Sequence, residues 1–278
     1  TGSALNLSSA LTLGYSGTGE LMATNNAIVN SSGGTLGQLA GSTGTATVSS
    51  GAQWTLPGGT QNSLIIGDAG TGILNINTGG TVSGGQASIT LGNAATGDGT
   101  LNVDGAGSVL DSQNSLTVGQ SGTGILNITN SGTASTHTVT AGADAGSTGV
   151  INVSQAGHLD MGNASAIGSY GSGTLNITEG GTVSIDEATL SVGGSEGGTG
   201  VLNVEGQGSA LTQNGAGNLM VGMSGSGAVN IHSGGAVSNK TLIASGMIAT
   251  ANGTITVDGA DSLLRSPLVY LGMMGSGT

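Results

Sequence analysis

The sequence is poor in charge, aromatic residues and proline, and it contains no cysteine. Only 6% of its 278 residues are charged, with two bases against 14 acids. A net charge of −12 argues against a nucleic-acid partner, because phosphate binding depends on lysine and arginine. The absence of cysteine excludes a disulfide framework and thiolate chemistry. No apolar run reaches the roughly 18 residues of a membrane-spanning helix.

Glycine is abundant, yet the composition is that of a folded chain. Glycine supplies 58 residues and proline only 2, together about a fifth of the chain and below the roughly 25–30% that is typical of disorder. Disorder also requires high charge and low hydrophobicity, whereas 36% of these residues are hydrophobic. The apolar residues are Val, Ile, Leu and Ala, spread evenly along the chain, which indicates a β-rich fold.

A repeat of 24–28 residues runs through the sequence. Its most constant segment is Gly-x-Leu-Asn-Val and close variants of it, and self-similarity at such a period is typical of a solenoid. The glycines that begin this segment are Gly19, Gly44, Gly72, Gly99, Gly124, Gly149, Gly173, Gly200, Gly227 and Gly253.

Each repeat also carries two further short apolar runs, such as residues 108–110 and 116–119. In a strand, Leu101 and Val103 would point to one face and Asn102 to the other. This period of two is typical of a half-buried strand. Strands this short bury a face only if each lies on its counterpart in the previous repeat. The sequence therefore predicts an all-β fold, a right-handed parallel β-helix with three strands per rung and about ten rungs.

The same architecture accounts for the residues that are scarce. Glycine suits the corners, where positive φ angles are needed, and proline would remove a donor from the strand ladders. We expect aromatic side chains to be too bulky for a core of stacked small aliphatics. The repeat pattern is open at both ends, so we expect residues 1–278 to form a single β-helical fragment, cut within a repeat at each end.

One asparagine recurs at the same place in successive repeats, as in Leu101-Asn102-Val103. On consecutive rungs these amides would hydrogen-bond to one another along the axis. We interpret the row as a structural ladder rather than a ligand site, because a ladder satisfies its own hydrogen bonds. Its members are Asn75, Asn102, Asn127, Asn152, Asn176, Asn203 and Asn230.

Repeats such as SLTVGQSGTGILNITNSGT and TLSVGGSEGGTGVLNVEGQGS resemble the passenger domains of autotransporters, the type V secreted proteins of Gram-negative bacteria. The resemblance covers nearly the whole chain and is strongest to the adhesin-type passengers. It implies export through a C-terminal β-barrel that this sequence does not contain, followed by display at the outer membrane or release. It also implies adhesion to a host surface or extracellular matrix, autoaggregation, biofilm formation and a part in virulence.

The sequence offers little enzyme chemistry. Serine-protease passengers carry a Gly-Asp-Ser-Gly type of motif, and residues 67–70 (Gly-Asp-Ala-Gly) place alanine where the nucleophile should be. Acid-base cleavage of a glycan needs clustered carboxylates, and we expect the acids to be scattered over different corners. His158 and Asp160 share a strand face without a third partner. We therefore predict no catalytic residues, no cofactor and no metal site, with a polysaccharide-processing or glycan-processing enzyme as the alternative.

Methionine marks one candidate binding site. The residue after the glycine of the third run is usually small or polar, but in the last three repeats it is Met223, Met247 and Met273. If the register holds, these side chains stack as an apolar stripe, and methionine suits adaptable surfaces. Two other interpretations remain open: the side chains fold back over the corner, or they contact the next rung of a longer protein.

The only bases form a second candidate site. Lys240 and Arg265 fall in the same corner of adjacent repeats, and Asp111, Asp186 and Glu187 occupy that corner earlier in the chain. The rod would then have an acidic flank and a small basic end. Either this is a solvated corner, or it is a patch complementary to a second copy of the rod.

Overall fold

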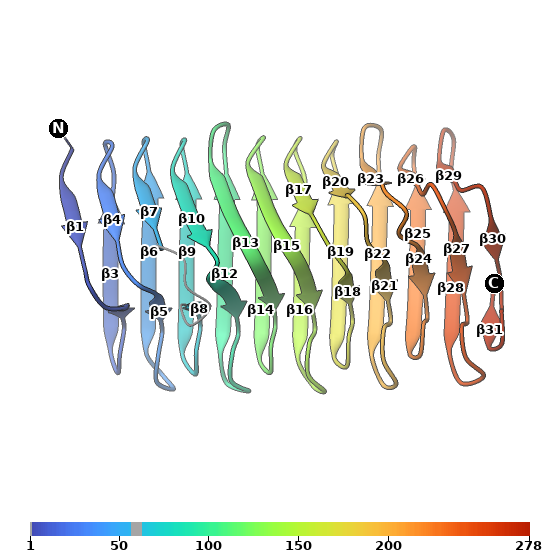
Figure 1. Ribbon diagram of the computed structural model, residues 1–278, viewed down its shortest axis with the longest axis horizontal. Coiled ribbons are helices and arrows are strands. Elements are labelled where there is room, and N and C mark those ends of the chain that lie inside the picture. The colour runs from blue at the N-terminus through green and yellow to red at the C-terminus, as the bar shows by residue number, and fades with distance from the viewer. Residues whose placement is uncertain (1, 57–62) are drawn as a thin grey trace.

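The described part of the protein is a straight rod of β-strands joined by turns. The computed structural model describes residues 2–56 and 63–278, and strands succeed one another along its long axis with the two termini at opposite ends (Figure 1). Within those ranges no helix is long and apolar enough to span a membrane. The chain descends in front and rises behind as it advances, which makes the coil right-handed (Figure 1).

One face of the rod is an 11-stranded parallel sheet formed by the Gly-x-Leu-Asn-Val segments. Each anchor glycine pairs directly with the next, from Gly19 through to Gly253, so the repeat found in the sequence sets the strand register. Its strands are β3 (Thr18–Ala23), β6 (Thr43–Ser49), β9 (Thr71–Asn77), β12 (Asp98–Asp104), β14 (Thr123–Thr129), β16 (Thr148–Val153), β19 (Ser172–Thr178), β22 (Thr199–Glu205), β25 (Ser226–His232), β28 (Asn252–Asp258) and β31 (Ser276–Gly277).

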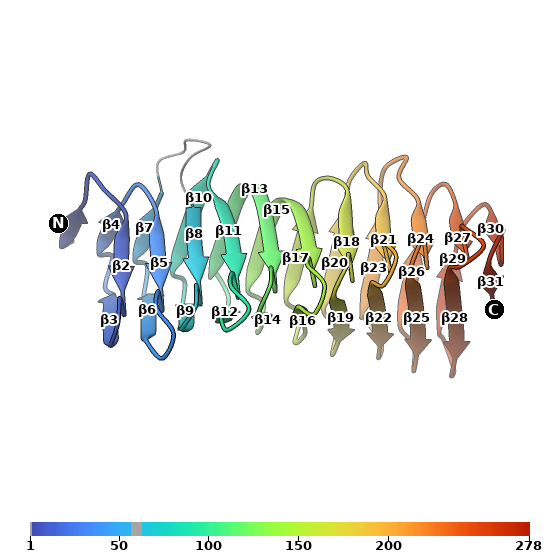
Figure 2. The same cartoon turned by 90° about the horizontal axis from the view of Figure 1, so that it is seen from below.

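The second apolar run of each repeat forms another parallel series (Figure 2). Each strand pairs with its counterpart one repeat later, as β17 does with β20. The separate strands of this series are β1 (Ala4–Asn6), β4 (Ile28–Asn30), β7 (Gln53–Thr55), β10 (Thr81–Gly85), β17 (His158–Met161), β20 (Thr182–Ile185), β23 (Ala210–Gln213), β26 (Ala236–Ser238) and β29 (Leu263–Arg265).

The third run completes each rung. Its separate strands are β2 (Leu11–Leu13), β5 (Gly34–Leu36), β8 (Ser63–Ile66), β11 (Ser88–Leu91), β18 (Ser165–Ile167), β21 (Leu190–Val192), β24 (Leu219–Val221), β27 (Ile243–Ser245) and β30 (Val269–Tyr270).

Two rungs depart from this division. There the second and third runs join into β13 (Val109–Val118) and β15 (Thr133–Ala141). Their pairing shifts register between Ser112 and Ser115. The strand therefore continues around the corner through a bulge, where other rungs have a turn between two separate strands. These two strands link the second and third series into one 20-stranded sheet. The predicted right-handed parallel β-helix, with three strands in most rungs, is confirmed.

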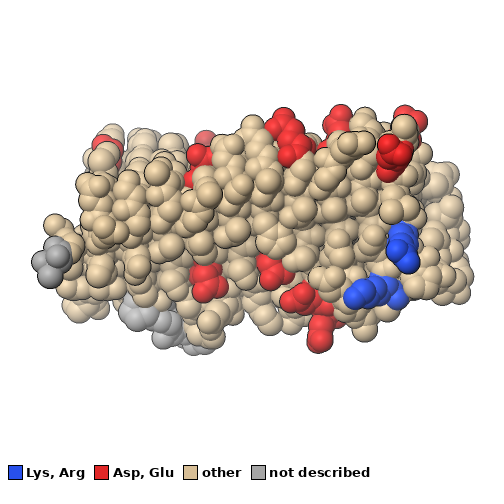
Figure 3. Space-filling view, turned by 90° about the horizontal axis from the view of Figure 1, so that it is seen from above, with Lys and Arg blue, Asp and Glu red and all other residues tan. Residues whose placement is uncertain are grey.

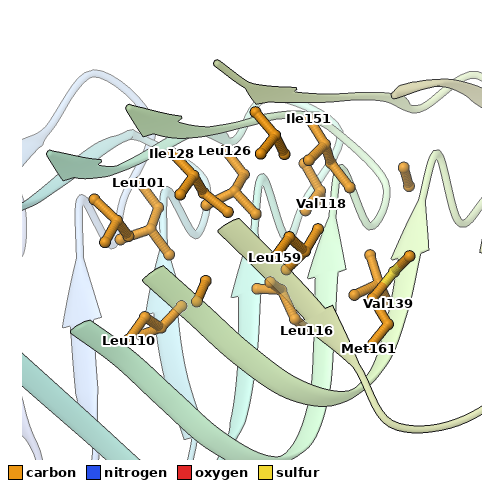
Figure 4. Close-up of a cluster of buried hydrophobic side chains, with 14 of the residues drawn as sticks. Leu101, Leu110, Leu116, Val118, Leu126, Ile128, Val139, Ile151, Leu159 and Met161 are labelled. Atoms are coloured by element: carbon orange, nitrogen blue, oxygen red, sulfur yellow. The ribbon is translucent and has the colours of Figure 1, made fainter. Parts of the chain in front are cut away.

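The core is a narrow aliphatic column enclosed by the three series. In β14, Leu126 and Ile128 are fully buried while Asn127 between them faces outward. Figure 4 shows these two side chains opposite Leu110, Leu116 and Val118, which come from β13. Each rung thus buries only a few side chains, and the column becomes continuous because neighbouring rungs stack.

Trp54 corrects the expectation that aromatic residues are too bulky for this core. Its side chain is completely buried, and its indole Nε1 donates to Ser31 Oγ at 2.9 Å. Room for the ring comes from Gly34, where an added Cβ would lie 3.0 Å from the ring atom Cζ2. One missing side chain in the preceding rung therefore offsets the extra volume of the indole.

The anchor glycines are required by close approach of the backbone rather than by an unusual φ. A Cβ at Gly124 would lie 2.1 Å from the backbone nitrogen of Gly119, and backbone atoms cannot move aside without breaking the ladder. Gly17, in the loop before β3, has nothing within 4 Å of an added Cβ.

We therefore expect Gly124→Ala to destabilise the rod, whereas Gly17→Ala leaves it unchanged. Overpacking of this kind costs about 1–3 kcal/mol, which lowers the Tm of a chain this size by about 2–4 °C per kcal/mol. Thermal unfolding followed by circular dichroism measures both variants. Equal Tm values for the two variants would show that the backbones approach less closely than described.

Candidate functional site

The candidate functional surfaces all lie on the outside of the rod, because the interior is filled. They consist of rows of equivalent side chains, one per rung, separated by the ~4.8 Å spacing of hydrogen-bonded strands.

The asparagine ladder runs down the outer face of the 11-stranded sheet. Its seven residues are half-buried and lie directly opposite one another in the strand register. Asn102 Nδ2 donates to Asn75 Oδ1 at 2.8 Å, and every later amide donates to the one before it in the same sense. The remaining donor–acceptor distances are 2.8 Å for Asn127–Asn102, 2.8 Å for Asn152–Asn127, 2.9 Å for Asn176–Asn152, 2.8 Å for Asn203–Asn176 and 2.9 Å for Asn230–Asn203.

A hydroxyl row accompanies the ladder on the same face. These residues are exposed and in register, at the start of consecutive strands. Between this row and the ladder lie half-buried residues such as Ile125 and Val150. The face thus combines a fixed line of amides with a line of free-standing hydroxyls. The members of the hydroxyl row are Thr123, Thr148, Ser172, Thr199 and Ser226.

The backbone hydrogen bonds of the methionine corner are only partly in register. Met223 N donates to Gly193 O at 3.0 Å and Met247 N to Gly222 O at 3.2 Å, so these two residues hold equivalent positions. Met273 N donates to Ser245 O, one residue out of step, and Met274 N takes the equivalent bond to Gly246 O.

Several methionines near the C-terminal end are exposed, and Met273 lies three residues after Tyr270 just as Met247 lies three residues after its paired residue Ala244. Met223 is 37% exposed and Met274 68% exposed, while Met247 is half-buried. Met273, the residue predicted for the stripe, is 45% exposed beside Met274. Exposed methionines thus recur at this corner, and their use as a binding site stays a prediction.

Lys240 and Arg265 lie close together on the outside of the second strand series. Both are exposed, and both line a hollow of about 520 Å³ whose lining contains no acidic residue. Figure 3 shows the two bases near the C-terminal end and acidic side chains in line with them nearer the middle of the rod. The predicted acidic flank and basic end are thus neighbours on one face.

The acids on this face are less scattered than the sequence indicated. Asp111, Asp160 and Asp186 share a shallow hollow of about 260 Å³ with His137. Asp160 Oδ1 accepts a hydrogen bond from Ser184 Oγ at 2.8 Å. From the sequence, Asp160 could be placed only beside His158 on its own strand. Which residues of other rungs lie next to it depends on the strand register, and the register cannot be counted across turns of varying length.

Two other carboxylates serve the turns. Thr129 Oγ1 and Asn130 Nδ2 donate to Asp104 Oδ1 at 2.7 and 2.6 Å, and these bonds lower the pKa of Asp104. Hydrogen bonds from Ser121 and then Gln120 likewise lower the pKa of Asp144. Both donors to each carboxylate come from an adjacent rung, so the bonds tie neighbouring turns together.

His137 and His158 each lie beside a neutral side chain of the next rung. His158 Nδ1 lies 2.8 Å from Thr182 Oγ1, and His137 Nε2 lies 3.1 Å from Asn163 Nδ2. Residues 2–56 and 63–278 contain no group of three His, Asp or Glu side chains that could hold a metal ion.

The surfaces and the strand pairing define the chain as a parallel β-helical rod. No family model and no curated protein matches the sequence. Among solved structures it is similar to the crystal structure of the TibC-catalysed, hyper-glycosylated fragment TibA55-350. The TM-score is 0.34 at 16% identity, covering 100% of this chain and 99% of that chain. A similarity of this size assigns neither a family nor an activity to the chain.

We expect Asn152→Ala to destabilise the rod, because it removes two hydrogen bonds from the middle of the asparagine ladder. Asn152 donates to Asn127 and accepts from Asn176, and each bond contributes about 0.5–1.5 kcal/mol. Thermal unfolding measures the loss, with Val150→Ala on the same strand face as the control. An Asn152→Ala variant no less stable than Val150→Ala would contradict a structural role for the ladder.

Proposed function

We propose that this chain is a non-enzymatic adhesive rod displayed at, or released from, the outer membrane of a Gram-negative bacterium. The observation that carries the proposal is the arrangement of its surface. Exposed hydroxyls recur once per rung in a straight row beside the asparagine ladder, and the described hollows lie on the outside of the rod. The resemblance of the repeats to autotransporter passengers supports the cellular location.

Rows of identical groups suit weak multivalent attachment. Each contact with a matrix component, a host surface or another rod is small, but many contacts at fixed spacing act as one strong attachment, since later contacts form at high effective concentration. A filled, rigid core keeps that spacing constant along the rod. Adhesion, autoaggregation and biofilm formation follow from one surface property, and no catalytic step is needed.

Display of the chain on a non-adherent bacterium tests the proposal. We expect displaying cells to settle faster than cells carrying an empty display scaffold, or to bind surfaces coated with matrix proteins. Cells that neither settle nor bind any coated surface would contradict an adhesive role. A variant carrying Thr148→Asp separates this face from other surfaces, since Thr148 is an exposed member of the hydroxyl row and the change adds a charge there while leaving the asparagine ladder intact.

The methionine corner is examined in the same assay. Replacing Met223, Met247, Met273 and Met274 by Ser keeps the chain length and removes the methionines of this corner. Unchanged settling and binding would exclude these methionines from the adhesive surface, and circular dichroism of the variant checks that any loss is not caused by unfolding.

A second candidate function is cleavage of a glycan. The observation in its favour is the acidic hollow, which gathers Asp111, Asp160 and Asp186 beside His137. Paired carboxylates supply the acid and base of glycoside hydrolysis. Release of reducing ends or unsaturated sugars from a panel of polysaccharides would favour this alternative, provided that Asp160→Asn abolishes it.

A further inference from the structure

The charges on the second strand series have a symmetry that the sequence alone does not reveal. Asp160, Ser184, Thr212, Ser238 and Arg265 occupy one row across the five consecutive strands β17, β20, β23, β26 and β29. Asp160 lies two strands before Thr212, and Arg265 lies two strands after it. At ~4.8 Å per strand, the two charges are roughly 19 Å apart along the rod.

A second pair of charges obeys the same rule. Asp186 lies two residues beyond Ser184, one strand before Thr212, and Lys240 lies two residues beyond Ser238, one strand after it. Asp160 and Asp186 therefore each have a base the same number of strands beyond Thr212, and Asp186 and Lys240 share a two-residue offset from the row, just past the ends of β20 and β26. Asp111 lies in the same row four strands before Thr212, outside these five strands. We call these four residues the charged row: Asp160, Asp186, Lys240 and Arg265.

This pattern is self-complementary in one orientation. A two-fold axis along β23, in the plane between two copies, reverses the rod direction and keeps the displacement along the strand. It places Asp160 opposite Arg265 of the second copy and Asp186 opposite Lys240, and the reverse pairs form by symmetry, as an isologous contact requires. Side-by-side pairing in the parallel sense would instead place like charges opposite each other.

The groups are held in position by hydrogen bonds to neighbouring rungs. Ser184 Oγ donates to Asp160 Oδ1 at 2.8 Å and fixes that carboxylate. Asn239, next to Lys240, is only 4% exposed, and its Nδ2 donates to Gln213 Oε1 at 2.6 Å and to Gly217 O at 3.0 Å. The corner that carries Lys240 is thereby anchored in the core, which lowers the entropy lost when the base meets a partner.

We propose that the charged row is a docking surface for a second copy of this chain, bound antiparallel about the two-fold axis along β23. The inference rests on the proposed adhesive function and specifies one of its contacts. Antiparallel pairing suits rods that extend toward each other from two cells. The contact spans five strands, so it is small and weak in solution, and it gains strength from many copies on a cell.

Sedimentation velocity of the purified chain over a concentration series tests the pairing. We expect a reversible dimer in about 0.01 M salt that dissociates in about 1 M salt, because the Debye length falls from about 30 to about 3 Å. Two double variants with equal net charge then separate specific pairing from general attraction. All the altered positions are exposed in the structure.

Asp186→Lys with Lys240→Asp exchanges one facing pair and keeps every opposite-charge contact. Asp186→Lys with Arg265→Asp makes all four contacts like-charged. We expect the first variant to dimerise like the unaltered chain and the second to dimerise at least about tenfold more weakly. Circular dichroism confirms that both are folded, and they share the change at position 186.

Equal dimerisation of the two variants, or a chain that stays monomeric at low salt, would overturn the docking surface. The display assay keeps this result apart from the proposed function. Cells displaying the unaltered chain that settle no faster than the mispaired variant, yet bind matrix, would exclude the charged row and leave the adhesive function intact. Cells that neither settle nor bind would refute the adhesive function itself.

Discussion

Direct stacking of each strand on its counterpart one repeat later is the constraint on which the whole structure depends. A run of three to seven residues such as β16 or β18 buries too little surface to be stable by itself. Once the anchor glycines lie on one another, every backbone ladder, the aliphatic column and the corner turns follow. The close approach at those glycines leaves no space for a Cβ, which explains why they recur.

The same constraint creates the surfaces. Any outward residue repeated once per rung becomes a straight row at strand spacing, whether or not it has been selected for binding. The asparagine ladder satisfies most of its own hydrogen bonds and stiffens the sheet, whereas the hydroxyl row and the charged row leave their groups available. The function of such a rod therefore depends on which rows keep hydrogen-bonding groups free for a partner and on which charges align across rungs.

Much of this architecture could be read from the sequence, because the information was local and periodic. The glycine anchors fixed the register of the main sheet, and the recurring asparagines indicated their own ladder. The sequence could not show that Gly34 makes room for Trp54, since that depends on which strands of adjacent rungs meet in the core. It also missed the joined strands β13 and β15, which depend on how each corner turns.

The symmetry of the charges depended on three-dimensional register for the same reason. Asp160 and Arg265 are separated by repeats of unequal length, so their equal distances from Thr212 appear only when strands are paired. Sequence spacing predicted a shared corner for Lys240 and Arg265, and it could not predict the matching positions of the acids.

Cysteine crosslinking tests the stacking most directly, because the chain has no cysteine of its own. Thr148 pairs with Ser172, both exposed, and Val150 pairs with Thr174. Paired Cα atoms lie ~4.8 Å apart, within the roughly 4.4–6.8 Å that a disulfide spans. We expect rapid disulfide formation on mild oxidation in the variant with Thr148→Cys and Ser172→Cys. The variant with Thr148→Cys and Thr174→Cys, offset by two residues, should stay reduced. Equal crosslinking in both variants, or none in the first, would contradict stacking in this register.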